Sequence, residues 1–354
     1  MTIICLRCLS MKLLRTLVNA YGVSGNEAEV RKIIYDEIKD HVDEVTVDKL
    51  GNLIAVKKGA RPRVMLAAHM DEIGLMIKGI DDEGIIFCSA VGGIIPGSLL
   101  ADIVHIEGKS KALHGVITTR QISAGVDFEE FPEIGDLIID TGLTRKELEK
   151  EGIGVGTFVG FERECNYLRY GKKILGKALD DRIGCFILIE LAKRIKNPKN
   201  EICFVFTVQE EFSLYGAKTS AFEVDPDWSI TVDTTPANDL ISKKEDTDTQ
   251  VITIGGGPVI TIMDEAFISD RCINDWMKKI AKKKKISLQF EVSDFGTTDA
   301  SMISVSKNGV PSTAISVPVR NIHTTSSIAH MRDIDQTVEI LEELIKDPPL
   351  SCLN

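Results

Sequence analysis

A glycine-punctuated stretch in the first half of the chain restricts the possible folds more than any other feature. Over residues 73–161, short apolar runs alternate with turns rich in glycine and aspartate, which is typical of a small all-β barrel or sandwich. On both sides, apolar runs of strand length alternate with helical patterns, which indicates a mostly parallel mixed sheet covered by helices. We therefore predict an α/β fold that is interrupted by an inserted small all-β domain.

These patterns divide the chain at definite positions. Residues 11–72 and 165–354 form the predicted α/β domain, and residues 73–164 form the predicted barrel-like insertion. Residues 1–10 precede a second methionine, Met11, which opens a well-patterned helix. We interpret residues 1–10 as an extension that the fold does not require.

Local signals predict individual elements. Ser24 and Glu27 have the spacing of a capping box, with Ser24 as the N-cap of a helix over residues 27–41. Residues 45–57 read as a hairpin, and the apolar run 64–68 as a strand buried on both faces. Further helices are predicted over about 11–20, 144–151, 181–194, 265–284 and 331–345, and further strands over about 202–208, 228–232 and 312–317.

The composition of the chain indicates which partners and which cellular compartment to expect. The net charge of -11 argues against a nucleic-acid-binding surface. No stretch reaches the ~18 uninterrupted apolar residues of a membrane span. The 8 cysteines have no spacing typical of a disulfide framework, so we expect free thiols and a reducing cytoplasm.

Potential metal ligands recur near the carboxyl ends of the apolar strands. Ligand sites in open α/β sheets lie at those ends, so several such coincidences carry more weight than any single one. The residues are His69, the pair Glu210 and Glu211, Asp233, and, six residues beyond Val317, His323.

Each of these residues also has an ordinary structural explanation. A histidine after a strand is more often structural, but Asp71 lies near enough to accept the second N–H of a metal-bound His69 imidazole. Adjacent glutamates occur in exposed loops, yet a pair at a strand end repels unless cations or protons intervene. A helix N-cap accounts for one of the aspartates Asp180 and Asp181, and a carboxylate that bridges two metals is the obvious use of the other.

The combined ligand set points to a particular chemistry. Two histidines and three carboxylates suit zinc, cobalt or manganese better than magnesium, which seldom takes imidazole. Two such ions ~3.5–4 Å apart can bind a carbonyl oxygen and activate a water. A general base and acid is also needed, and Glu210, beside Glu211, is the candidate.

From Met11 to about Ile345 the chain resembles the tetrahedral (TET-type) metallo-aminopeptidases, the family that includes bacterial glutamyl aminopeptidases and proteins called cellulase M. The resemblance rests on several motifs in the family's order. They are Ala68-His-Met-Asp-Glu-Ile-Gly74, Gly176-Lys-Ala-Leu-Asp-Asp-Arg182, Gln209-Glu-Glu211 followed by Gly216-Ala217, Val232-Asp233, residues 255–258, Gly296-Thr-Thr-Asp-Ala300 and Arg320-Asn-Ile-His323.

The resemblance implies a phosphorylase/hydrolase-like α/β fold and a role for each site residue. His69, Asp180 and Asp233 would hold one metal, and Asp180, Glu211 and His323 the other, with Asp180 as the bridge. Glu210 would be the catalytic base and acid, and Asp71 would orient His69. Zinc or cobalt is the expected metal, with manganese as a further candidate. The peptide bond between Asp180 and Asp181 would be cis.

The resemblance also implies an assembly. The inserted β domain would form homodimers, and the dimers would build hollow dodecamers that admit short peptides.

Two segments depart from the family's pattern. The family usually follows its last histidine with Ser-Pro and a glutamate four residues on. Here His323 is followed by a Thr-Thr-Ser-Ser run, and no acidic residue appears until Asp333. The inserted domain is altered as well, at Gly115-Val-Ile-Thr-Thr-Arg120. Neither change removes a metal ligand.

We expect an aminopeptidase that uses metal-activated water. The alternative is a two-metal amidohydrolase, a deacylase or carboxypeptidase-like enzyme, that acts on another or N-blocked amide. A glycosidase is disfavoured because two-carboxylate glycosidases need no metal pair, and a non-enzymatic peptide-binding protein would not need Glu210. Asp299 is open to two interpretations, a substrate-pocket residue or an aspartate in a turn or N-cap.

Overall fold

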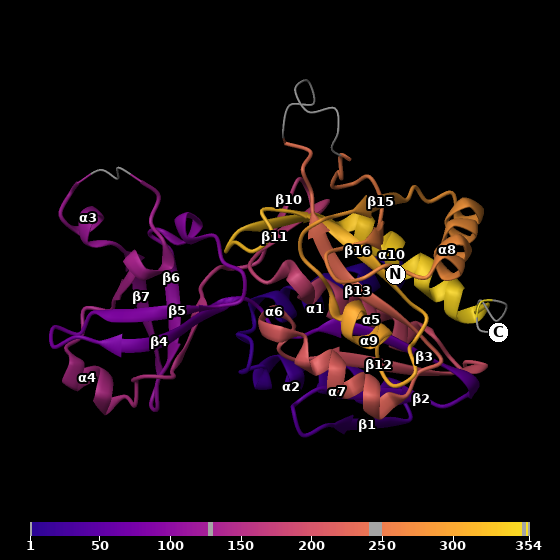
Figure 1. Cartoon of the computed structure of the whole chain (residues 1–354), viewed down its shortest axis with the longest axis horizontal. Coiled ribbons are helices and arrows are strands. Elements are labelled where there is room, and N and C mark those ends of the chain that lie inside the picture. Colours follow the sequence, from indigo (N-terminus) through magenta and orange to yellow (C-terminus); the bar gives the residue numbers. More distant parts are fainter. Residues whose placement is uncertain (1, 127–129, 241–249, 349–351, 353–354) are drawn as a thin grey trace.

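A helix-covered sheet and a separate small barrel lie side by side in the computed structural model of the chain (Figure 1). The structure describes residues 2–126, 130–240, 250–348 and 352. The mixed α/β architecture confirms the predicted fold class.

Four parallel strands form the centre of the large sheet. They run in the order β12 (Asn200–Thr207), β3 (Ala60–His69), β13 (Trp228–Pro236) and β16 (Ser312–Arg320). Because these strands are parallel, their carboxyl ends meet at one edge of the sheet. Antiparallel neighbours and an added pair flank them: β1 (Glu44–Val47), β2 (Leu53–Lys57), β17 (Ser327–His330), β11 (Lys173–Gly176), β10 (Asn166–Leu168), β14 (Val259–Met263) and β15 (Gln289–Val292).

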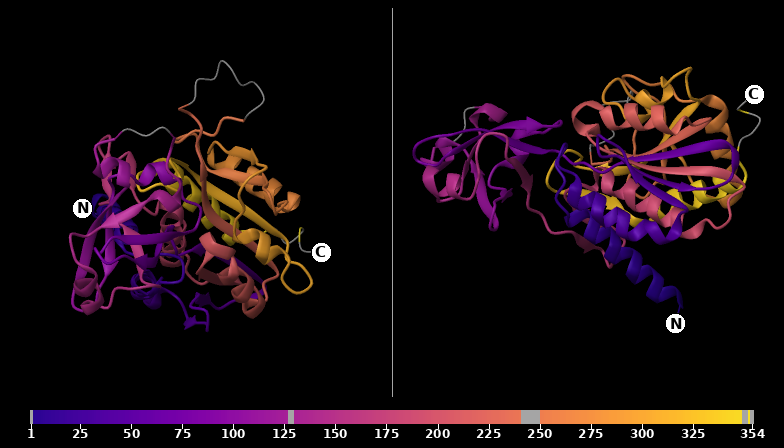
Figure 2. Two further views of the ribbon diagram at one scale, coloured as in Figure 1. Left: turned by 60° about the vertical axis from the view of Figure 1, so that its left-hand side comes forward. Right: turned by 90° about the horizontal axis from the view of Figure 1, so that it is seen from below.

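The apolar run of β3 explains why helices cover both faces of the sheet (Figure 2, right). Val64, Leu66 and Ala68 enter one apolar core, and Met65 and Ala67 enter another, as the two-residue period of a strand requires. The first core contains α1 (Thr2–Asn19), α2 (Ala28–Ile38), α5 (Leu179–Arg194), α8 (Arg271–Lys284) and α10 (Met331–Lys346), and the second is covered by α7 (Tyr215–Val224) and α9 (Asp299–Ser304).

The glycine-rich stretch folds into a closed six-stranded barrel with its own apolar core. Two short helices, α3 (Arg120–Ser123) and α4 (Arg145–Lys150), lie in its connections. Around the barrel the strands are β4 (Gly74–Ile80), β5 (Ile86–Val91), β8 (Ile138–Asp140), β7 (Ala112–Thr118), β6 (Ile103–Glu107) and β9 (Phe158–Phe161).

The predicted capping box at Ser24 is wrong. Glu27 lies immediately before α2, and its carboxylate accepts the backbone N–H groups of Gly25 at 2.6 Å and Gln209 at 3.2 Å. This carboxylate therefore connects the start of α2 to the segment after β12, and it does not reach back to the backbone N–H of Ser24.

Two predicted helix starts are also wrong. The helix expected from residue 265 begins at Arg271, because the Asp270 carboxylate accepts the backbone N–H of Ile273 as an N-cap. The helix expected from Met11 begins at Thr2, so residues 2–10 continue α1 towards the N-terminus. Within the described residues, no helix combines the length and apolarity needed to cross a membrane.

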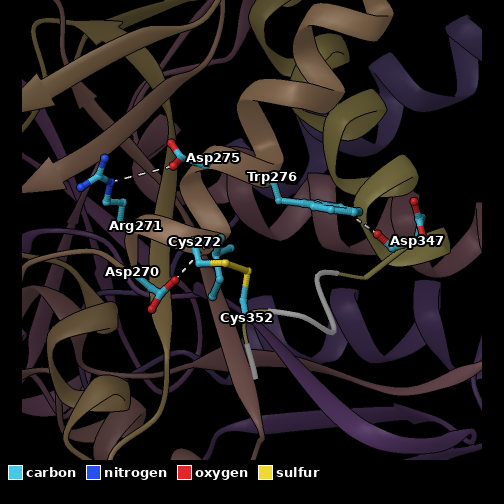
Figure 3. The surroundings of a disulfide bond; sticks show 8 residues. Asp270, Arg271, Cys272, Asp275, Trp276, Asp347 and Cys352 are labelled. Atoms are coloured by element: carbon cyan, nitrogen blue, oxygen red, sulfur yellow. Dashed lines mark hydrogen bonds and ion pairs between the residues drawn. A yellow bond between two sulfur atoms is a disulfide. The ribbon is translucent and has the colours of Figure 1, made fainter. Parts of the chain in front are cut away.

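The expectation of free thiols fails for one pair. Cys272, in the first turn of α8, forms a disulfide with Cys352, which follows α10 (Figure 3). The two helices pack together, and the Trp276 indole N–H donates to the Asp347 carbonyl oxygen at 2.9 Å. This packing brings together cysteines 80 residues apart in the sequence. Four other cysteines are buried free thiols: Cys88, Cys165, Cys185 and Cys203.

Replacing Cys352 with Ser is expected to lower the free energy of unfolding under oxidising conditions by up to about 4.5 kcal/mol, the chain-entropy value for closing a loop of this length. Denaturant unfolding with and without a reductant measures the effect. The reductant should destabilise the wild type to the level of the variant and leave the variant unchanged. A wild type insensitive to reductant would contradict the prediction.

Candidate metal centre

Candidate ligands meet at the edge of the sheet where the parallel strands end. His69 is the last residue of β3 and pairs with Thr207, the last residue of β12. Glu210 and Glu211 are the first residues of α6 (Glu210–Ser213), which follows β12. Figure 1 shows α6 on the side of the sheet domain that faces the barrel.

Two of the candidate ligands, Asp233 and His323, lie at positions that differ from the predicted ones. Asp233 lies within β13, not beyond its end. However, β13 pairs with β3 only as far as Thr231, so Asp233 extends past that pairing towards the end of β3. The strand β16 continues to Arg320, and His323 follows it after only a short turn.

Five of the side chains form two groups in which one ligand atom of each residue lies within 4.8 Å of the others. In the first group, His69 Nε2 lies 3.3 Å from Asp180 Oδ1 and 3.8 Å from Asp233 Oδ1. In the second, His323 Nε2 lies 3.4 Å from both Asp180 Oδ2 and Glu211 Oε2. Asp180 thus presents one oxygen to each imidazole, as a carboxylate shared by two metal ions would.

Glu210 belongs to neither group but lies beside the first. Its Oε2 is 3.9 Å from His69 Nε2, and its side chain is 10% exposed. A carboxylate at this position can exchange a proton with a molecule bound at the centre without being a ligand itself.

Asp71 connects the first imidazole to the glutamate pair. Its Oδ1 lies 3.5 Å from His69 Nδ1, and its two oxygens accept the backbone N–H groups of Glu210 and Glu211, each at 3.1 Å. Burial opposes the ionisation of Asp71, but His69 and these N–H groups outweigh it and lower its pKa. The carboxylate is therefore charged and contacts three candidate site residues, His69, Glu210 and Glu211.

The electrostatics of the centre fit a cation. Burial is the largest cause that raises the pKa of Glu210 and Asp233. Burial, followed by the Asp180 carboxylate, raises the pKa of Glu211 to about 8. Burial acts against the ionisation of Asp180 as well, but contacts with His323 and His69 lower its pKa. Buried carboxylates this close together need compensating positive charge, and oxygen and imidazole donors suit divalent transition-metal ions.

Asp180 and Asp181, for which the sequence predicts different roles, have different surroundings. Asp181 is buried, and its carboxylate accepts the backbone N–H of Gly184 at 2.9 Å and that of His69 at 3.3 Å. The first contact is of the N-cap kind, so Asp181 takes the structural role and leaves Asp180 for the centre. The peptide bond between them is cis.

A buried ion network, which the sequence did not predict, joins the segment after His69 to the start of α5. Glu72 receives Lys177 Nζ at 2.7 Å and Arg182 Nη2 at 3.3 Å, and all three side chains are at most 2% exposed. Arg182 Nε also donates to the Met70 carbonyl oxygen at 2.7 Å. The network fixes the segment after His69 against the start of α5. The signal available in the sequence was the presence of charged residues inside two of the motifs, Ala68–Gly74 and Gly176–Arg182.

Asp299 is buried, and it lies close enough to the centre for its charge to add to the effect of burial in raising the pKa of Glu210 and Asp233. It is the first residue of α9, whose N-cap is Thr298, so the N-cap interpretation of Asp299 is wrong. Its Oδ2 accepts the hydroxyl of Thr207, and burial raises its pKa to about 7.

Two glycines of the barrel domain lie against the candidate metal centre. Gly92 and Gly93 follow β5 and lie against the second ligand group. A Cβ atom at Gly93 would be 3.1 Å from His323 Nδ1, and one at Gly92 would be 3.3 Å from Glu211 Cβ. Side chains larger than hydrogen at these positions would press on two candidate ligands.

Comparisons with known proteins agree with this geometry. A family model described as M42 glutamyl aminopeptidase matches residues 51–340. A putative aminopeptidase of Acetivibrio thermocellus is 38% identical over 333 residues, covering 94% of this chain and 97% of that protein. An aminopeptidase of the archaeon Desulfurococcus kamchatkensis superposes with a TM-score of 0.92 at 32% identity, with 98% of this chain and 97% of that chain covered.

A second similar structure is the TET1 peptidase of Pyrococcus horikoshii, which can assemble into a tetrahedron or a large octahedral shell. It superposes with a TM-score of 0.84 at 33% identity and covers 96% of this chain and 99% of its own.

Proposed function

This chain belongs to the M42 glutamyl aminopeptidase family and is a metal-dependent aminopeptidase, and from that premise we propose that it removes N-terminal residues from short peptides with two divalent metal ions in each subunit. The observation that carries the proposal is the position of Asp180, whose two oxygens face imidazoles from two different ligand groups.

His69, Asp180 and Asp233 would hold one ion, and Asp180, Glu211 and His323 the other. Zinc or cobalt is proposed, with manganese as a further candidate, because the donors combine imidazole with carboxylate. When bound, the pair would polarise the scissile carbonyl group and lower the pKa of a water molecule.

Protein side chains would then carry out the proton transfers of the reaction. Glu210 would accept a proton from the attacking water through its carboxylate and deliver it to the leaving amine nitrogen. Burial, which raises the pKa of Glu210, favours a group that can hold that proton between the two transfers. Asp71 would keep His69 and the Glu210 backbone aligned throughout.

Cleavage of matched peptides tests the reaction. Free-amine peptides should lose their first residue, and the same peptides with an N-acetyl group should resist. Equal hydrolysis of both forms would instead favour the alternative, a two-metal amidohydrolase such as a deacylase or carboxypeptidase-like enzyme.

Metal analysis tests the two-ion proposal. Purified protein dialysed against zinc or cobalt should bind two ions per chain, and a chelator should abolish turnover until either metal is restored. A saturating content of one ion per chain would contradict it, as would full activity in the chelated protein.

We propose that the barrel forms homodimers and that the dimers assemble into a dodecamer. The barrel presents exposed apolar side chains, among them Phe131 at 89% and Val155 at 78%, as an interface between copies would require. The similarity to the TET1 peptidase supports the larger assembly. Native mass spectrometry of the wild type and of Phe131→Asp tests it: the variant should form smaller species.

A cytoplasmic location is also proposed. In that compartment reducing systems would hold Cys272 and Cys352 largely as thiols. Cell fractionation followed by alkylation of free thiols tests both points.

A further inference from the structure

We propose that Asp102, a residue of the inserted barrel, is a positioning residue for His323 and therefore for the second ligand group. This inference rests on the two-metal centre proposed above. The contact that carries it joins the barrel to the loop of residues 321–327, which contains His323.

Asp102 lies just before β6, and each of its carboxylate oxygens has a partner. Oδ2 accepts the hydroxyl of Thr325, a residue that is 3% exposed, and Oδ1 receives Arg163 Nη2 at 2.9 Å. The Asp102 side chain is itself only 14% exposed. Arg163 fixes the carboxylate, and the carboxylate then fixes Thr325, two residues after His323.

His323 depends on its loop for its position because its ring has no carboxylate beside Nδ1 among the described residues. The contacts of His323 with Asp180 and Glu211 are both made through Nε2, whereas His69 also has the Asp71 carboxylate 3.5 Å from its Nδ1. The backbone at His323 has φ +57°, a left-handed conformation that non-glycine residues rarely adopt. The ring must therefore be placed by its loop.

Hydrogen bonds between its own residues connect the two ends of the loop. The hydroxyls of Thr324 and Ser327 donate to the Asn321 carbonyl oxygen at 2.7 and 2.8 Å, and Asn321 Nδ2 donates to the Ser326 carbonyl oxygen at 3.3 Å. These contacts define the shape of the loop. Among the described residues, the hydrogen bond that ties it to the barrel is the one from Thr325 to Asp102.

The barrel meets His323 from a second direction. Gly93 lies against the imidazole, where even a Cβ would be 3.1 Å from Nδ1. The ring is thus confined by the loop after β5, and its own loop is anchored to the residue before β6. The chain has no acidic residue close after His323, and the carboxylate that stabilises this region comes instead from position 102.

Titration of metal-free protein with Zn²⁺ in a calorimeter tests the proposal. We expect two binding steps in the wild type, with the step lost in His323→Ala identified as the second group. Thr325→Val and Asp102→Asn should weaken that step by about 10–100-fold, as loss of an outer hydrogen-bond partner does, and leave the first step unchanged. Thr325→Ser, which keeps the hydroxyl, should retain wild-type affinity at both steps.

Glu162→Gln is the matched barrel control, because Glu162 contacts His114 and not the His323 loop. Unfolding midpoints of all variants are measured alongside. The role of Asp102 would be overturned if the wild type showed two steps and neither Thr325→Val nor Asp102→Asn changed them. Equal weakening of both steps by these substitutions would also overturn it. A single step in the wild type would overturn the two-metal centre itself.

Discussion

Replacing Glu210 with Gln is expected to lower kcat by about 10²–10⁴-fold, the usual contribution of general acid–base catalysis. The amide keeps the size of the side chain but cannot accept and return a proton. Because Glu210 lies outside both ligand groups, metal content should stay at the wild-type value. Steady-state kinetics on a free-amine peptide, with elemental analysis of the same sample, measures both quantities.

The matched control for this prediction is Glu164→Gln, which removes an exposed carboxylate that pairs with Arg15 and belongs to neither ligand group. It should keep wild-type kcat and metal content. If Glu210→Gln lost one ion per chain, Glu210 would be a ligand, and if it kept full turnover, another group would carry the proton.

Replacing Asp180 with Ala is expected to remove both metal ions and with them essentially all turnover, a loss at least as large as that of Glu210→Gln. Each Asp180 oxygen faces a different imidazole, at 3.3 and 3.4 Å, so one truncation deprives both groups of a ligand. Metal content after dialysis against trace zinc measures the effect.

Asp233→Ala is the informative comparison, because Asp233 belongs to the first group alone. It should lose one ion and retain the other. A variant of Asp180 that still bound two ions would show that the carboxylate does not bridge. Circular dichroism of each variant checks that the fold is intact.

Much of the centre could be predicted from local sequence because parallel strands bring their ends to one edge. The apolar run before His69 and the run before Glu210 and Glu211 specify both the strands and the place where each ends. Asp233 lies in the same group as His69 although its strand is longer than predicted, since the register of β13 on β3 places Asp233 level with His69, the last residue of β3.

Features that join distant segments could not be predicted in the same way. Glu72 and Lys177 are 105 residues apart, and Asp102 and Thr325 are 223 apart. No periodicity or spacing connects such pairs, since only the completed fold brings them together. The disulfide of Cys272 with Cys352 belongs to the same class.

The capping box failed for a related reason. Its spacing was correct, but the Glu27 carboxylate found a long-range partner in the backbone N–H of Gln209. A local signal is reliable when its groups have no competing partner, and here the tertiary structure offered one.

Closure of the barrel determines how this domain can meet another molecule. The six strands pair all the way round, from β4 through β5, β8, β7, β6 and β9 back to β4, so none of the six is an edge strand. A partner cannot extend that ring by adding a strand, as it could at an open sheet edge. A partner must therefore recognise the barrel through its side chains. Substitutions on the barrel surface can then change the contacts between copies without disrupting the pairing of the strands.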